Sequence, residues 1–165
     1  MEDLKAVTVY TDGACLGNPG PGGYAALILA NGQRRELKGN FKETTNNRME
    51  MMAAIAALES LGERCRVVLH SDSSYLVNAM TKGWALRWQR MGWRRNKNEP
   101  ARNADLWARL LGICQRHQVD FLWVKGHDSS AENLRCDQLA NEAARVPDRP
   151  GDEGYRRPPA KFRLF

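Results

Sequence analysis

The spacing of hydrophobic and polar residues divides the chain into alternating strand-like and helix-like segments. Five segments are rich in β-branched and aromatic residues and are predicted to be strands: 6–12, 24–30, 35–41, 66–70 and 119–124. Four segments place apolar residues at helical spacing and are predicted to be helices: 49–61, 72–80, 103–115 and 132–145. This order, three strands linked by short turns followed by alternating helices and strands, predicts a mixed sheet with crossover helices, an α/β fold.

Length and composition favour one folded domain. The chain has 165 residues, of which 42% are hydrophobic and 27% charged. We expect the domain to cover residues 1–146 and an extended tail to cover 147–165, which holds four of the seven prolines. There is no apolar run of the ~20 residues needed to cross a bilayer, and the first residues lack a signal-peptide pattern. The four scattered cysteines favour reduced thiols, so we expect a cytoplasmic protein without membrane contact.

The net charge of +6 is concentrated in one stretch, residues 82–102, which we call the basic handle. It carries seven basic residues: Lys82, Arg87, Arg90, Arg94, Arg95, Lys97 and Arg102. Its one acid is Glu99, so the handle accounts for the whole net charge of the chain. A basic patch of this kind indicates a polyanionic partner.

Four acids stand at positions that acids usually avoid. Asp12 and Asp72 each follow a predicted strand, where ligands gather in α/β folds, although Asp12 fits an Asp-Gly turn and Asp72 a helix cap equally well. Glu50 shares a helical face with Ala54, Ala57 and Leu61, which directs its carboxylate inward. Asp137 borders the apolar stripe of the last helix and fits a half-exposed surface acid as well. If the four carboxylates converge, they form an oxygen site suited to Mg²⁺.

The chain resembles ribonuclease H type 1, the bacterial forms in particular, in a series of ordered motifs between about Val7 and Ala144. The matching blocks are Tyr10–Tyr24, Thr44–Glu50, Ser71–Ser73, Gly92–Trp93, Asn103–Trp107, Trp123–His127 and Glu132–Ala140. The resemblance implies a ribonuclease H-like fold, with a five-stranded mixed sheet flanked by helices and a basic handle. It also implies hydrolysis of the RNA strand of RNA–DNA hybrids, leaving 5′-phosphate and 3′-hydroxyl ends.

The resemblance assigns catalytic roles to five residues. Asp12, Glu50, Asp72 and Asp137 match the metal ligands, which hold two Mg²⁺ ions with substrate, Mn²⁺ being an alternative. His127 matches a residue that assists proton movement or product release, work suited to a group that titrates near neutral pH.

The resemblance also implies a substrate-binding surface. The matching positions are Asn18, Thr45, Asn46, Asn47, Ser74, Trp84, Trp88, Arg90, Trp93, Arg94, Arg95 and Asn103. Among them, Thr45 and Asn103 match a pocket for a DNA phosphate. The tryptophans also fit a packing role and the asparagines fit turn or cap roles. Ser74, Gly83 and Asp128 depart from the pattern of many relatives, and none of them is one of the four acids.

Two other functions remain open at this stage. A DNA-cutting integrase or resolvase shares an acidic cluster on a related fold, although it lacks the Asn-Pro-Gly-Pro-Gly-Gly turn and the tryptophan-rich handle. A non-catalytic hybrid-binding module would be marked by loss of an acid, and all four are present. We expect a monomer that needs no obligate protein partner and recognises an RNA–DNA duplex.

Overall fold

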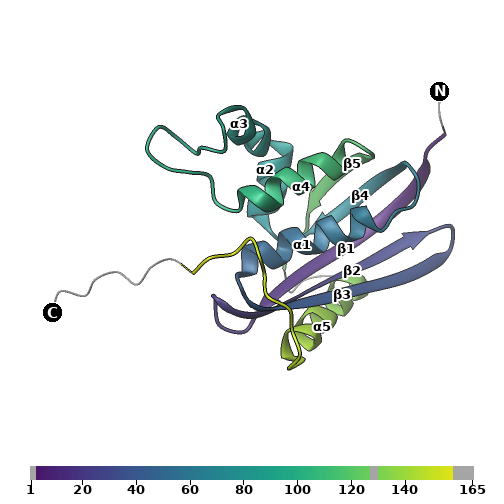
Figure 1. Ribbon diagram of the computed structural model, residues 1–165. Coiled ribbons are helices and arrows are strands. Elements are labelled where there is room, and N and C mark those ends of the chain that lie inside the picture. Colours follow the sequence, from purple (N-terminus) through teal and green to yellow (C-terminus); the bar gives the residue numbers. More distant parts are fainter. Residues whose placement is uncertain (1–2, 127–129, 158–165) are drawn as a thin grey trace.

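The computed structural model describes residues 3–126 and 130–157, and these contain a sheet flanked by helices (Figure 1). The strands are β1 (Lys5–Cys15), β2 (Gly20–Ala30), β3 (Gln33–Thr44), β4 (Cys65–Ser71) and β5 (Gln118–Trp123). The helices are α1 (Asn46–Glu59), α2 (Ser74–Thr81), α3 (Trp84–Arg90), α4 (Ala104–Cys114) and α5 (Ala131–Arg145). No helix in these two ranges is long and apolar enough to cross a membrane.

The five strands form one mixed sheet in the order β3-β2-β1-β4-β5. The pairs β1–β2 and β2–β3 are antiparallel, whereas β1–β4 and β4–β5 are parallel. The predicted antiparallel meander and mixed sheet are therefore confirmed. The parallel pairs require crossover connections, and these are the helices between β3 and β4 and between β4 and β5.

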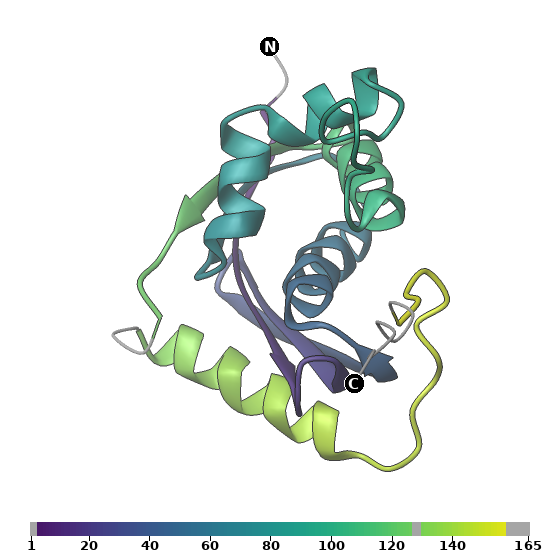
Figure 2. The same ribbon diagram turned by 90° about the vertical axis from the view of Figure 1, so that its left-hand side faces the viewer.

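Helices cover the sheet on both faces, with α5 on one side and α1 on the other (Figure 2). Helix α1 also packs against α4, so it is buried almost all round rather than along one stripe. Its side chains are mainly Ala, Met and Leu, which fill the space between the sheet and α4 without a polar face. This burial makes α1 a fixed support for any functional group it carries.

The first two strands are longer than predicted. Strand β1 continues through Gly13 to Cys15, and β2 begins at Gly20 inside the predicted turn. Asp12 is therefore inside a strand, and the alternative of an Asp-Gly turn is wrong. Gly13 serves a different purpose, because a Cβ there would lie 2.6 Å from the carbonyl carbon of Met49. Its missing side chain lets α1 approach β1 closely.

The basic handle begins with a short helix, α3, which follows α2 directly. Gly83 separates α2 from α3 with a left-handed φ of 74°, a conformation that glycine adopts without strain. Trp88 of α3 is only 9% exposed, and its ring centroid lies 5.8 Å from that of Trp107. The packing role considered for the tryptophans is therefore confirmed for Trp88, which anchors the handle to α4.

Residues 146–157 contain no helix or strand, but they lie against the domain (Figure 1). After α5 the chain returns past the end of β3, where the Lys42 amide donates to the Pro150 carbonyl at 2.8 Å. Farther on, Asp152 forms an ion pair with Arg48 of α1. The described part of the tail is thus fixed at two points, one at the end of β3 and one at the start of α1.

Candidate active site

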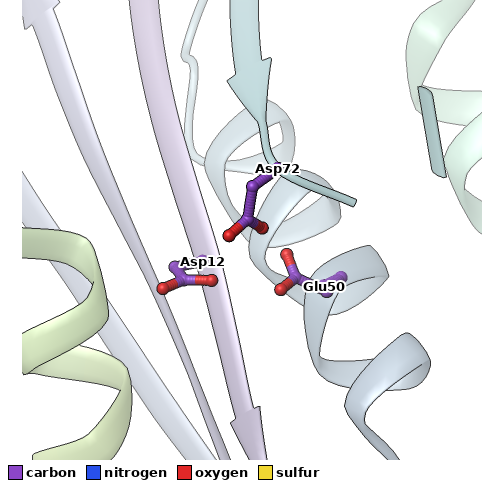
Figure 3. Close-up of side chains that lie close together, drawn as sticks. All are labelled: Asp12, Glu50 and Asp72. Carbon is purple, nitrogen blue, oxygen red and sulfur yellow. The ribbon is translucent and has the colours of Figure 1, made fainter. Parts of the chain in front are cut away.

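Three of the four predicted carboxylates meet at one place. Asp12 comes from β1, Glu50 from α1 and Asp72 from the end of β4, and their carboxylates point toward one another (Figure 3). One oxygen from each lies within 4.8 Å of the others. The convergence that the sequence only permitted is therefore present in the fold.

The sheet itself creates the place for Asp12. The parallel pairing of β1 with β4 ends at Tyr10 and His70, whereas β1 continues beside β2 past Asp12 and Ala25. Asp12 consequently lies just beyond the point where β4 stops pairing with β1. Its carboxylate has no β4 neighbour in the ladder and faces the residues that follow that strand.

The Asp72 side chain can face the other two carboxylates because the adjacent Ser73 caps the next helix. The Ser73 hydroxyl accepts from the Leu76 amide at 3.2 Å and is the N-cap of α2. The cap role considered for Asp72 is thus filled by Ser73. The Trp123 indole donates to the Asp72 carbonyl at 3.1 Å and holds the backbone of this turn.

Glu50 is the most deeply buried of the three, with 4% of its surface exposed. This confirms the inward orientation predicted from its helical face. Its Oε2 atom is buried and has no hydrogen-bond partner among the described residues. Burial first, and then the nearby charges of Asp12 and Asp72, raise the pKa of Glu50 well above its usual value.

Asp12 is perturbed for the same reasons. Burial, followed by the charge of Asp72, raises the pKa of Asp12 to about 7. Its contacts with Glu50 and the Gly13 amide act in the opposite direction but do not cancel the rise. At neutral pH the metal-free cluster therefore retains protons that isolated carboxylates would have lost.

Asp137 approaches the cluster from α5 without joining its close group of three carboxylates. Its side chain is exposed on α5, at the border of the apolar stripe where the sequence placed it. It nevertheless lines a small cavity of about 40 Å³ together with Asp12 and Asp72. The other lining residues are Thr11, Val124, Lys125, Gly126, Asn133 and Leu134. His127, the fifth predicted catalytic residue, and Asp128 lie outside the described residues.

This donor set fits a hard divalent cation. All of its side-chain donors are carboxylate oxygens, and one of them is a buried oxygen that has no partner in the part of the chain that the structure describes. A buried carboxylate without a partner is costly, and a cation in contact with it removes that cost.

A second hollow, of about 570 Å³, lies between the basic handle and α1. It brings together five predicted substrate-binding residues: Asn47, Trp84, Trp88, Arg95 and Asn103. Three further residues of the handle also line it: Arg87, Asn96 and Arg102. The handle therefore presents cations and aromatic faces in one groove, as a nucleic-acid backbone requires.

The remaining predicted substrate residues surround the start of α1 or lie on the handle. Thr45 is the N-cap of α1, and the Asn18 side chain accepts from the Asn46 amide at 3.1 Å. The cap role considered for the asparagines therefore holds for Asn18. Ser74 is exposed at the start of α2. The other members, Arg90, Trp93 and Arg94, do not line the groove.

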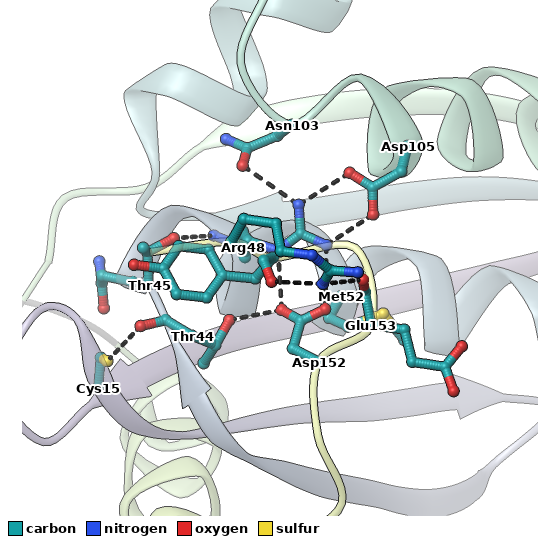
Figure 4. Close-up of polar contacts among 12 residues, drawn as sticks. Cys15, Thr44, Thr45, Arg48, Met52, Asn103, Asp105, Asp152 and Glu153 are labelled. Atoms are coloured by element: carbon teal, nitrogen blue, oxygen red, sulfur yellow. Dashed lines mark hydrogen bonds and ion pairs between the residues drawn. The ribbon is translucent and has the colours of Figure 1, made fainter. Parts of the chain in front are cut away.

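One charged residue near the site was not predicted to matter. Arg48 lies on the same helical face as Met52 and Ile55, and it is buried beside Asn103 (Figure 4). Its place on an apolar stripe indicates that it needs acidic partners. The sequence alone could not identify those partners, because they are Asp105 and Asp152, distant along the chain.

Fold and site together place the chain in a class: α/β proteins that carry a carboxylate cluster, suited to a divalent cation, at the split of a mixed sheet. The RNase H family profile matches residues 4–145. The chain is 58% identical to a Ribonuclease H from Desulforamulus reducens over 150 residues, which cover 91% of this chain and 94% of the relative. The protein belongs to the ribonuclease H family, whose members are endoribonucleases that depend on divalent metal ions.

Solved structures agree with this assignment. LC9-RNase H1, described as a type 1 RNase H with the type 2 active-site motif, superposes with a TM-score of 0.77 at 35% identity. That match covers 87% of this chain and 74% of the other. LC11-RNase H1, solved in complex with an RNA/DNA hybrid, gives a TM-score of 0.65 at 28% identity, covering 84% of this chain and 96% of the other. The ribonuclease H-like fold predicted from the motifs is therefore confirmed.

Proposed function

We propose that this protein is an Mg²⁺-dependent endoribonuclease that hydrolyses the RNA strand of RNA–DNA hybrids and leaves 5′-phosphate and 3′-hydroxyl ends. The observation that carries the proposal is the convergence of Asp12, Glu50 and Asp72 within 4.8 Å, with a buried Glu50 oxygen that has no partner within residues 3–126 and 130–157. Membership of the ribonuclease H family and the hybrid-bound relative support the choice of substrate.

The four acids would hold two metal ions when substrate is bound. Asp12 belongs both to the cluster with Glu50 and Asp72 and to the lining of the cavity that Asp137 shares, which suits a residue that would contact both ions. An all-oxygen donor set favours Mg²⁺, with Mn²⁺ as an alternative. When bound, the ions lower the pKa of water and stabilise the charge that develops on the leaving 3′-oxygen.

The protein side chains position these groups and the RNA. Glu50 is held by the buried helix α1, so its carboxylate stays in place as substrate arrives. It can also accept a hydrogen bond from a ribose 2′-hydroxyl, the group that distinguishes RNA from DNA. We assign His127 to proton movement or product release.

The handle and the start of α1 would hold the DNA strand. Arg95 and the exposed part of Trp84 face the groove beside α1 and can contact phosphates and sugars. Thr45 and Asn103 form the proposed site for a DNA phosphate. Around them, Asn18, Asn46, Asn47 and Ser74 are assigned to the minor groove of the hybrid. Phosphate contacts position a duplex without reading its sequence, so we expect low sequence preference.

In the cell, this activity would remove RNA primers and R-loops. We propose that the enzyme is cytoplasmic, that residues 1–146 form its catalytic domain, and that it acts as a monomer without an obligate protein partner. Light scattering of the purified protein tests the last point, because a dimer would double the measured mass.

Cleavage assays test the proposal directly. A labelled RNA–DNA hybrid is incubated with the protein, with and without Mg²⁺, beside RNA–RNA and DNA–DNA duplexes and an Asp12→Asn variant. We expect Mg²⁺-dependent cutting of the RNA strand of the hybrid alone, lost in the variant. Cleavage of the DNA duplex would favour the integrase class, and tight hybrid binding without cleavage would favour a binding module.

A further inference from the structure

Arg48 is a buried cation held by two acids from distant parts of the chain. Its side chain is 2% exposed and lies two residues before Glu50 on α1. The guanidinium donates to Asp105 from Nη1 at 2.8 Å and from Nη2 at 2.6 Å. It donates to Asp152 from Nε at 2.8 Å and from Nη2 at 3.0 Å (Figure 4). Both contacts are bidentate, the geometry that fixes an arginine most firmly.

The remaining guanidinium proton orients Asn103. Arg48 Nη1 donates to the Asn103 Oδ1 atom at 3.3 Å, so all five N–H groups of the guanidinium are used. At its other end, the Asn103 amide donates to the Tyr75 hydroxyl at 3.2 Å. The side-chain amide of Asn103 is thus held at both ends, with its carbonyl toward Arg48.

Arg48 orients Thr45 through its backbone. The Arg48 amide donates to the Thr45 Oγ1 atom at 3.3 Å, so the lone pair of the hydroxyl is directed toward the helix. Within residues 3–126 and 130–157, no hydrogen bond uses the Thr45 hydroxyl proton or the second amide proton of Asn103. One arginine therefore fixes two side chains that each keep a donor for an anion.

The position of Arg48 depends in turn on the tail. The Asp152 side chain is 9% exposed and also accepts from the Thr44 hydroxyl at 2.7 Å. Gly154 passes so close that a Cβ there would lie 2.7 Å from Arg48 Nη2. Asp105, by contrast, is 44% exposed. Of the two carboxylates that balance the charge of Arg48, the tail thus supplies the buried one. The tail also shields the guanidinium from water.

We propose that Asp152 is a positioning residue for substrate: by holding Arg48, it keeps the free donors of Thr45 and Asn103 ready for one backbone phosphate of the DNA strand. This inference rests on the proposed function, which supplies the DNA phosphate. Without the Asp152 charge, Arg48 is held by Asp105 alone and turns toward it. Asn103 then loses the contact that fixes its amide.

Binding to hybrids with single neutral phosphates tests the inference. Each DNA phosphate in turn is replaced by a methylphosphonate, and dissociation constants are measured without metal for the wild type and Asp152→Asn. We expect one position at which neutralisation weakens wild-type binding about tenfold, the effect of losing a charge-assisted hydrogen bond. Asp152→Asn should weaken binding of the unmodified hybrid by a similar factor and show no further loss at that position.

Kinetics and matched variants separate positioning from folding. Asp152→Asn should raise KM and leave kcat within about twofold, whereas Asp152→Glu should restore part of the affinity. Glu43→Gln is the control, because it removes the exposed ion pair between Glu43 of β3 and Arg157 of the tail and leaves Arg48 untouched. If Asp152→Asn is unfolded at the assay temperature, Asp105→Asn replaces it and should show the same coupling at the same phosphate.

Two results would overturn the inference. One is that Asp152→Asn binds all hybrids more weakly but still loses as much affinity as the wild type when that phosphate is neutralised. Asp152 would then have only a structural role. The other is that no single phosphate matters to the wild type. A wild type that binds hybrids but never cuts them would refute the proposed function instead, and the binding comparison would still decide the role of Asp152.

Discussion

At the scale of single residues, the site contains crowded carboxylates that lower the stability of the metal-free protein. Asp12 and Glu50 are buried beside Asp72, and both have raised pKa values because burial and like charges disfavour ionisation. In the unfolded chain these carboxylates ionise freely. Each one is therefore a source of instability in the metal-free protein at neutral pH.

Replacing Asp12 with Asn should stabilise the metal-free protein while removing activity. The folded pKa of Asp12 is raised, so the folded state binds more protons than the unfolded state between about pH 4 and 7, and stability falls across that range. We expect the Asp12→Asn variant to gain on the order of 2 kcal/mol at pH 8 and to lose this advantage near pH 4. Urea unfolding in EDTA at both pH values measures the difference. An equal gain at both would show that charge is not the cause.

Metal binding should displace protons from the same cluster. Because the Asp12 pKa is about 7, the metal-free site is partly protonated at neutral pH. We expect Mg²⁺ affinity to rise up to about tenfold per pH unit below pH 7 and to level off above it. Calorimetry in two buffers with different ionisation enthalpies counts the protons released. Release that is zero at pH 6.5 would contradict a raised Asp12 pKa.

At the scale of elements, the site depends on how closely α1 approaches β1. Gly13 permits this contact, since a Cβ there would meet the Glu50 amide nitrogen and the Met49 carbonyl carbon. The same approach brings Glu50 within reach of Asp12. The glycine next to Asp12 thus acts through packing rather than through a turn.

Gly13→Ala should therefore damage both stability and the site. We expect a loss of about 1–3 kcal/mol from overpacking, together with weaker Mg²⁺ binding because Glu50 is displaced from Asp12. Gly62→Ala is the matched control: nothing lies within 4 Å of its added Cβ and its φ is not positive, so its stability should be unchanged or slightly higher. Thermal unfolding and calorimetry measure both effects. Equal stability of the two variants would contradict the close approach.

The sequence predicts elements better than it predicts their junctions. Period-2 and helical patterns placed all five strands and the main helices, because those patterns report which face of each element is buried. The glycines at the end of β1 and the start of β2 resembled a turn, because local propensity cannot show that helices pack against those glycines. The convergence of Asp12, Glu50 and Asp72 came from motif resemblance and could not be derived from spacing. Asp152 escaped prediction because a Pro-rich segment carries no pattern that reports its docking.

At the scale of the whole molecule, charge is divided between two regions. The carboxylates gather at the split of the sheet, while the entire net charge of +6 lies in the basic handle. The handle groove also contains Asn103, which Arg48 connects to the start of α1. Under the proposed function, the handle attracts the substrate and the carboxylate cluster cuts it.

Neutralising one handle cation should weaken binding without changing sequence preference. Arg95 lines the groove, and its pairing with Glu99 at 3.7 Å is exposed and therefore weak. We expect Arg95→Gln to reduce the slope of log affinity against log salt by about 1. Arg66→Gln is the control and should leave the slope unchanged. Arg66 is exposed at the start of β4, at the other end of the strand from Asp72. Titrations of a hybrid at several salt concentrations measure both slopes, and equal slopes for the two variants would contradict a role for the handle in phosphate binding.

The buried oxygen of Glu50, which has no hydrogen-bond partner among the described residues, has a consequence for any attempt to evolve this protein in the laboratory. A screen that rewards only resistance to heat would favour substitutions that remove the crowded carboxylates, since each such change relieves repulsion in the metal-free state. Survivors of that screen would keep the sheet, the helices and the handle, and would still bind duplexes. A library of this enzyme therefore has to be selected for turnover and heat resistance together, because selection for heat resistance alone leads to a folded protein without activity.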